Sequence, residues 1–347
     1  MANGALVFGK LVVKGETTYG TGAAADFATG GRRMNVTPTG VISLGREYDT
    51  GADRTIGIRN PMIASRVVQL SENPEVTIDA PAITTDDLAV WLSSVQKTNA
   101  AGTPTGTAAP YTWSMPIGLS VGSAIAPKSL EAIVVDNNQG YHVSGILPTS
   151  VSLSADNSGI TSLSVSAFAQ AVTKTSQTTA DAVDTTGRGM AGRLWQLSYG
   201  TAFLAAGTGT ANGATLFTHL MDWSLEFQTG MAPINAQAGS ITAADYNQFA
   251  GPVGGTLSLT VASNDAAVAQ LFDKLGTKSY WRLHWEDAAS PKHEVDILVC
   301  AVPTNVEVMA GDADGLITYS AELMLATDDN GTSSVTFQVK NSLSVLP

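Results

Sequence analysis

The sequence predicts a mainly-β protein made of two tandem β-sandwich or half-barrel domains, each with one short α-helix. Three observations carry this prediction. Apolar and polar residues alternate with a period of two over many short stretches, which is typical of half-buried strands. One hairpin pattern occurs twice, at 147–170 and again at 302–326. The length of 347 residues suits two domains of ordinary size better than one.

Each copy of the repeated hairpin opens on Pro-Thr-X-Val, at 148–151 and 303–306. A turn rich in Asp, Asn and Gly follows, at 156–159 and 311–315, and a second alternating run completes the hairpin. Apolar residues form one face of that second run. Its polar face consists of Ser162, Ser164 and Ser166 in the first copy and of Thr318, Ser320 and Glu322 in the second. The repeat indicates a duplicated domain.

The predicted boundaries follow from this duplication. Residues 1–172 are assigned to the first domain and 190–347 to the second, with enough apolar sequence for two cores. Residues 173–189, rich in Thr, Ser, Ala, Asp and Gly, have the composition of a linker. The spacing between copies falls from 180 residues at the helices to 155 at the hairpins, so the first copy is longer. Its extra Gly/Ala/Thr/Pro-rich stretch, 98–109, is predicted to be a surface loop on the first domain only.

The remaining elements are predicted in chain order from local patterns. Strands are expected at 6–13, 36–44, 76–78, 280–285 and 335–339. Thr84 begins a helix as its N-cap, with an apolar stripe following at helical spacing. The stripe residues are Leu88, Trp91, Leu92 and Val95, matched in the second copy by Val268, Leu271, Phe272 and Leu275 ahead of Gly276. Both stripes are interpreted as core packing.

Two long polar connections, 46–61 and 228–251, occupy matching places in the two copies. Long connections in compact domains are often functional. We therefore expect both to be contact loops, with an ordinary surface loop as the alternative.

The charge distribution bounds the possible partners. Only 14% of residues are charged and the net charge is −12, against a usual charged fraction of about 25%. Residues 1–66 carry a balance of +3 and the rest of the chain −15. This asymmetry is compatible with head-to-tail self-association, although a solvated charge bias explains it equally. It argues against nucleic-acid recognition, which needs a concentrated basic face.

The sequence indicates neither a disulfide nor a targeting segment. The single cysteine, Cys300, lies in an apolar run and is expected to be buried. No secretory signal is recognised at the N-terminus, and no apolar run approaches the roughly 18 residues of a membrane span.

Two clusters contain residue types that bind metal ions. His284 and Glu286, followed by His293 and Glu294, contain ligand types, but their alternation with aromatic residues favours a hairpin. The 312–315 stretch resembles part of a calcium loop but lacks its closing glutamate, so turn chemistry is preferred. No nucleophile elbow or phosphate-binding glycine motif occurs. The sequence therefore predicts no enzyme, no cofactor and no metal.

Together these features resemble those of a known protein family. The chain's β-rich halves, each with a short helix, a long loop and a Ser/Thr-rich hairpin, resemble the tail tube (major tail) protein of long, non-contractile-tailed bacteriophages, in a tandem-duplicated form. The likeness spans 5–170 and 190–342 and includes phrases such as Arg54-Thr55-Ile56 ahead of Pro61 and Gly255-Thr256-Leu257-Ser258-Leu259 ahead of a helix.

The resemblance implies stacked rings that form a hollow tube for DNA ejection, with trimeric, pseudo-hexameric rings for a duplicated chain. Partners would be the chain itself, the tape-measure protein and the tail terminator, with DNA passing without specific binding and no membrane contact. The location would be the virion, after assembly in the host cytoplasm. The six polar hairpin residues above are the candidates for the lumen. The candidates for ring-to-ring contact are Arg54, Arg59, Asn60, Gln228 and Asn235.

Two alternatives remain open at this stage. A non-viral tandem β-sandwich surface or adhesion protein would share the fold, but such proteins often carry calcium sites and a signal peptide. The inner tube of a contractile injection system is the other alternative, although those tubes are usually built from single-domain chains.

Overall fold

The computed structural model describes residues 10–23, 27, 31–34, 36, 41–49, 68–95, 105–106, 108–117, 128–135, 139–176, 186–200, 215–234, 245–247, 254–264, 268–313, 315–327 and 334–346. Antiparallel strands dominate them, and within these ranges each half of the chain contains one short α-helix. The mainly-β prediction is thus confirmed.

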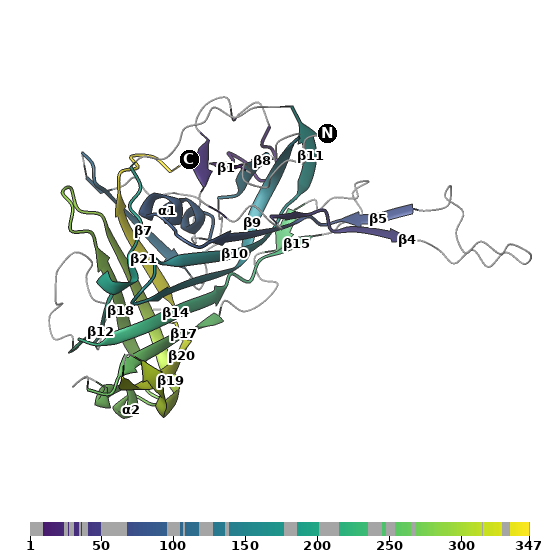
Figure 1. The fold of residues 1–347 in the computed structure, drawn as a ribbon. Coiled ribbons are helices and arrows are strands. Elements are labelled where there is room, and N and C mark those ends of the chain that lie inside the picture. The colour runs from purple at the N-terminus through teal and green to yellow at the C-terminus, as the bar shows by residue number, and fades with distance from the viewer. Residues whose placement is uncertain are drawn as a thin grey trace, which may run out of the picture.

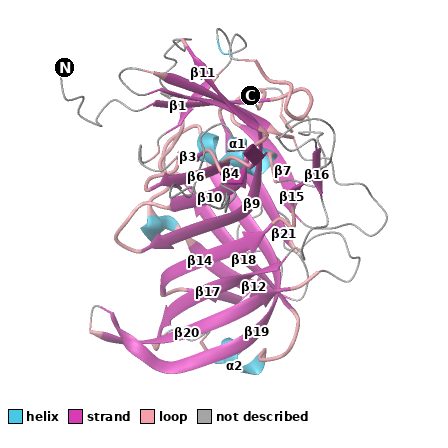
Figure 2. Ribbon diagram, turned by 90° about the vertical axis from the view of Figure 1, so that its right-hand side faces the viewer, coloured by secondary structure: helices cyan, strands magenta, loops and turns pink. Residues whose placement is uncertain are grey.

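One continuous antiparallel sheet, here called the long sheet, runs through both halves of the chain (Figures 1 and 2). Each of its eight strands pairs with the next. In spatial order they are β3 (Ile42–Ser43), β6 (Glu75–Ala80), β10 (Ser162–Phe168), β9 (Gly140–Asp156), β14 (Leu220–Gln228), β17 (Gly254–Ala262), β20 (Leu316–Leu325) and β19 (Glu294–Ala313).

Two further sheets are built on the same long strands, because β9 and β19 each change neighbours partway along. The first back sheet has the order β2 (Arg32–Met34), β1 (Lys10–Gly15), β8 (Leu130–Val135), β9 and β11 (Ala171–Thr175). The second has the order β13 (Thr215–Phe217), β12 (Gln196–Gly200), β18 (Ser279–Glu286), β19, β21 (Val335–Asn341) and β7 (Tyr111–Ile117).

The pairing pattern repeats between the halves. β9 pairs with β10, β8 and β11 as β19 pairs with β20, β18 and β21. Both predicted hairpins are present, with β9–β10 in the first half and β19–β20 in the second. The predicted linker, 173–189, begins inside β11.

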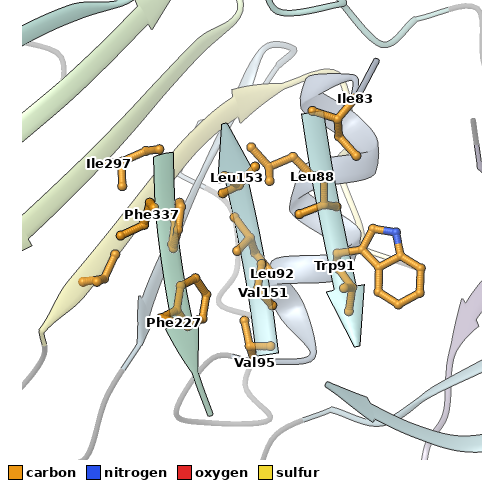
Figure 3. Close-up of a cluster of buried hydrophobic side chains, with 14 of the residues drawn as sticks. Ile83, Leu88, Trp91, Leu92, Val95, Val151, Leu153, Phe227, Ile297 and Phe337 are labelled. Carbon is orange, nitrogen blue, oxygen red and sulfur yellow. The ribbon is translucent and has the colours of Figure 1, made fainter. Parts of the chain in front are cut away.

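The largest hydrophobic cluster spans both halves of the chain, so their side chains share one core region. Figure 3 shows Leu88 and Leu92 of α1 (Thr85–Ser93) near Val151 of β9, with Phe227 of β14 and Phe337 of β21 alongside. Since the long sheet presents one continuous apolar face, the side chains of both halves pack into a single interior.

The strand that follows the predicted insertion connects the two halves. Thr105 and Ala108 are exposed, but β7, which follows directly, pairs along its whole length with β21 of the second half. The indole Nε1 of Trp113 also donates a hydrogen bond to the carbonyl of Leu343, at 3.0 Å. β7, the strand after the predicted insertion, therefore joins the halves, which period-two patterning alone does not reveal.

Polar contacts reinforce this junction at the start of α1. The buried His293 lies between the hydroxyls of Thr85 (2.9 Å) and Ser342 (3.1 Å). Arg32 forms ion pairs with Asp86 and Asp87 in the first helical turn. The two halves are thus connected by sheet, core and hydrogen bonds.

The second helix differs from its prediction. α2 (Ala269–Asp273) is only five residues long and buries Leu271, whereas Leu275 is 44% exposed. Because the helix ends at Asp273, Leu275 lies beyond the stripe that packs on the core. Gly276 has a φ of +67°, the left-handed conformation expected just after a helix.

The predicted N-cap of α1 is present, and it supports a stability prediction. The Thr84 hydroxyl accepts a hydrogen bond from the amide of Asp87, at 3.2 Å. Replacing Thr84 with alanine is expected to destabilise the fold by about 1 kcal/mol, because this amide loses its partner. Urea denaturation measures the change. Thr84→Ser should restore most of the loss, and equal destabilisation by both substitutions would contradict the capping role.

Candidate functional site

The long sheet has one apolar face and one polar face, in keeping with the period-two patterning. The apolar side chains lie in the shared core, and examples from three strands are Val165, Leu225 and Leu259. The opposite face, here called the polar face, carries hydroxyl and carboxylate side chains. This face is the candidate functional site, because nothing in the described structure covers most of it.

The polar face is acidic. Among the side chains whose exposure is described, seven carboxylates of this face are exposed, and none of the eight long-sheet strands contains a lysine or an arginine. The acids are Glu75, Asp79, Asp156, Asp222, Glu226, Glu307 and Glu322. At neutral pH such a surface repels polyanions. Of these acids, only Glu322 was predicted to lie on this face. Alternation along 75–80 and 220–228 is the signal that identifies others.

The predicted hairpin residues mostly occupy this face. Ser162, Ser164 and Ser320 are partly exposed, and Ser166 is exposed, as is Glu322. Thr318 differs, because it is only 4% exposed and lies opposite Gly311, where β19 departs from regular pairing.

Hydrogen bonds order the hydroxyls of the polar face. Ser154 and Ser162 on neighbouring strands are joined through their hydroxyls at 2.8 Å, and Ser164 donates to Asp79 at 2.8 Å. At the turn after β9, a carboxylate oxygen of Asp156 accepts from the amides of Ser158 and Gly159. The Ser158 hydroxyl and these amides hold the pKa of Asp156 below its ordinary value, so this acid stays charged.

The long sheet ends in two strands with one open edge each. Among the described strands, β3 pairs only with β6, and β19 beyond residue 302 pairs only with β20. Open edges expose unpaired backbone groups and invite pairing with another chain. Apolar side chains also lie exposed at these edges, with Leu44 41%, Val308 50% and Met309 68% accessible.

A two-stranded arm begins in the first predicted contact loop and ends beyond it, and a second arm lies within the other predicted loop. β4 (Arg46–Asp49) pairs with β5 (Val68–Glu72), and β15 (Ala232–Ile234) pairs with β16 (Asp245–Asn247). Figure 1 shows the β4–β5 arm extending well beyond the body of the molecule. Both arms connect corresponding strands of the long sheet, β3 to β6 and β14 to β17. Paired strands thus lie on either side of 50–67 and of 235–244.

Most predicted ring-contact residues cannot be placed. Arg54, Arg59, Asn60 and Asn235 lie outside the described residues. Gln228 is the last residue of β14, opposite both Ser150 and Gly254. It is therefore part of the polar face rather than of a loop.

The residues considered for a metal lie in separate contacts. Glu286 forms an ion pair with Lys292, and Glu294 forms one with Lys340. Within the described part of the chain, no group of three or more metal-ligating side chains occurs. Asp314, in the stretch resembling a calcium loop, lies outside that part. Cys300 is fully buried, as predicted.

His284 belongs to a buried charge network on the second back sheet. Asp296, 3% exposed, accepts hydrogen bonds from Arg282 at 2.7 Å and from His284 at 2.8 Å. Burial alone raises the pKa of Asp296, but the two hydrogen bonds and the Arg282 charge hold it below the ordinary value. Both partners of Asp296 lie on β18 of this sheet.

Comparison with known proteins assigns no identity to the chain: no family model matches it, and neither does any curated protein. No helix in the described ranges combines the length and hydrophobicity needed to cross a membrane.

Proposed function

We propose that the chain is a structural virion protein whose copies form stacked rings, trimeric and pseudo-hexameric, that make the hollow tail tube of a long, non-contractile-tailed phage. The tube is the conduit for DNA ejection. Self-association is the primary interaction, and the tape-measure protein and tail terminator are further partners.

The observation that carries this proposal is the continuity of the long sheet through both halves. β9 and β14 pair antiparallel over seven residues, from Asp222 opposite Asp156 to Gln228 opposite Ser150. The sheet therefore already extends from one half to the next without a break. Repeating this step between chains closes a ring with no free edge.

The dimensions of such a ring suit a channel. Three copies of the eight-stranded sheet supply 24 strands. With strands about 4.8 Å apart and tilted by about 40°, the barrel is about 48 Å across between backbones. Since the apolar face is covered by the back sheets, the polar face lines the bore. Its carboxylates repel the DNA phosphates, and its strands contain no lysine or arginine that would bind them. DNA can therefore pass without adhering.

The two arms suit contacts along the tube axis. Each arm begins at a long-sheet strand, and the β4–β5 arm extends beyond the body (Figure 1). A contact between successive rings that does not close on itself produces a filament. The arms thus supply stacking contacts while the sheet edges supply contacts within a ring.

Electron microscopy of the purified protein tests this function. We expect rings or hollow tubes of uniform bore, appearing above a threshold concentration. Dispersed monomers at every concentration and salt tested, or solid fibres without a bore, would contradict the proposal. A tandem β-sandwich surface protein would give dispersed monomers. The experiment therefore also distinguishes a tube protein from a surface protein.

A further inference from the structure

The junction between the two halves is the pairing of β9 with β14. The strands at the two open edges can be compared with it position by position. In the second half, β14 lies beside β17 with Leu225 opposite Leu257. In the first half, β3 lies beside β6 with Ile42 opposite Val76. Val76 lies opposite Ala167 and Leu257 lies opposite Leu323, which are equivalent positions of the repeated hairpins, so Ile42 corresponds to Leu225. Two residues further on, Leu44 corresponds to Phe227.

The other side of the junction is matched in the same way. Val151 of β9 lies opposite Val165 of β10, and Val306 of β19 lies opposite Ala321 of β20. Val165 and Ala321 are equivalent in the repeated hairpins, so Val306 corresponds to Val151.

Inside the chain, Val151 pairs directly with Phe227, and both are buried, at 1% and 0% exposure. Among the described residues, their counterparts Leu44 and Val306 have no corresponding partner across an open edge. Leu44 is 41% exposed and Val306 is partly exposed. The difference arises because Val151 has a neighbouring strand from the other half, whereas Val306 lies at an open edge. The open edge of β3 thus resembles β14 at the internal junction, and the open edge of β19 resembles β9.

We propose that β19 of one copy pairs antiparallel with β3 of a second copy in the register of the internal junction. Val306 then lies opposite Leu44, Glu307 opposite Ser43, and Asn305 opposite Gly45. This inference rests on the proposed ring assembly and specifies which residues form its subunit interface.

Two features limit and support this pairing. Regular pairing of β19 with β20 is interrupted between Glu307 and Gly311, where Met309 has a φ of +55°. A bulge of this kind ends the regular register, so the interchain ladder is shorter than the seven pairs within the chain. The exposed Val308 and Met309 lie in the bulge, where an approaching second copy covers them.

The internal junction also has a contact that the interchain junction lacks. β7 of the first half adds to β21 of the second, while 274–278, described throughout, contain no strand between α2 and β18. We therefore infer that the interchain junctions are the weaker seams of the ring, alternating with reinforced junctions inside each chain.

Cysteine cross-linking tests the register. Ser43→Cys with Glu307→Cys places two thiols opposite each other on the polar face, within the distance that a disulfide spans. Ser152→Cys with Glu226→Cys is the matched control, because these residues face each other inside one chain. Leu44→Cys with Glu307→Cys is the off-register control, because its thiols lie on opposite faces of the sheet. The native Cys300 is buried and is replaced by alanine in all three variants.

Oxidised glutathione is added to each assembled variant, and the products are separated by denaturing electrophoresis. The test pair is expected to give covalent dimers and trimers, the matched control an internally linked monomer, and the off-register pair neither. If microscopy shows rings but only the matched control forms its disulfide, the register is wrong while the proposed function stands. If no variant and no wild-type sample assembles, the proposed function and this inference both fail.

Discussion

Replacing Leu44 with lysine is expected to abolish assembly at concentrations where the wild-type protein forms rings, while leaving the monomer folded. Leu44 is 41% exposed at the open β3 edge, so the isolated chain tolerates a charge there. In the proposed interface the same side chain is covered by Val306 of the next copy. Losing leucine burial costs about 1.5–3 kcal/mol per interface, and burying an unpaired charge adds to this.

Because about 1.4 kcal/mol corresponds to a tenfold change in an equilibrium constant, the critical concentration should rise by more than roughly 100-fold. Light scattering against protein concentration measures this threshold, and circular dichroism checks the fold. Val345→Lys is the control, since Val345 is 73% exposed and lies in neither proposed edge. Equal assembly of the Leu44 variant and the control would remove β3 from the interface.

Replacing Asp296 with alanine is expected to lower the free energy of unfolding by about 3–5 kcal/mol, because Arg282 is left as a buried, unpaired charge. The guanidinium and carboxylate are both about 4% exposed and lie 2.7 Å apart. Chemical denaturation measures the loss. Removing both charges, with Arg282→Met and Asp296→Leu, should recover most of the stability. If the double variant is as unstable as the single one, packing rather than charge is responsible.

The same carboxylate gives the stability a defined pH dependence. Its pKa in the folded protein is below the ordinary value of 3.8, so folding favours its ionised form. The resulting contribution is fully present above pH 3.8 and is lost as the pH falls through the lower folded value. We expect the wild type to lose more stability than the double variant on acidification in this range. Denaturation midpoints at pH 5 and pH 3 test the difference.

Several elements were predictable because their signals are local. The hairpins at 147–170 and 302–326 follow from alternation and turn residues, and the start of α1 follows from Thr84 and the apolar stripe. Burial of Cys300 follows from its apolar neighbours. In each case the residues that determine the structure lie within a few positions of one another.

The features that local patterns did not predict depend on residues that are far apart in the sequence. The pairing of β7 with β21 depends on residues more than 200 positions apart, and the hydrophobic cluster shared by both halves depends on the pairing of β9 with β14. The exposure of Leu275 depends on where α2 ends. Periodicity states which side of a strand is buried, but not which strand lies beside it.

For the candidate site, the sequence by itself determined that the repeated hairpins have a polar face, because alternation places Ser162, Ser164 and Ser166 on one side of a strand. Only the tertiary structure decided that the hairpins join one long sheet, that its acids share one surface, and that β3 and β19 end it with open edges. The physical reason is that strands pair through backbone N–H and C=O groups, which are the same for almost every residue type. Neighbours in a sheet are therefore selected by the packing of the whole chain.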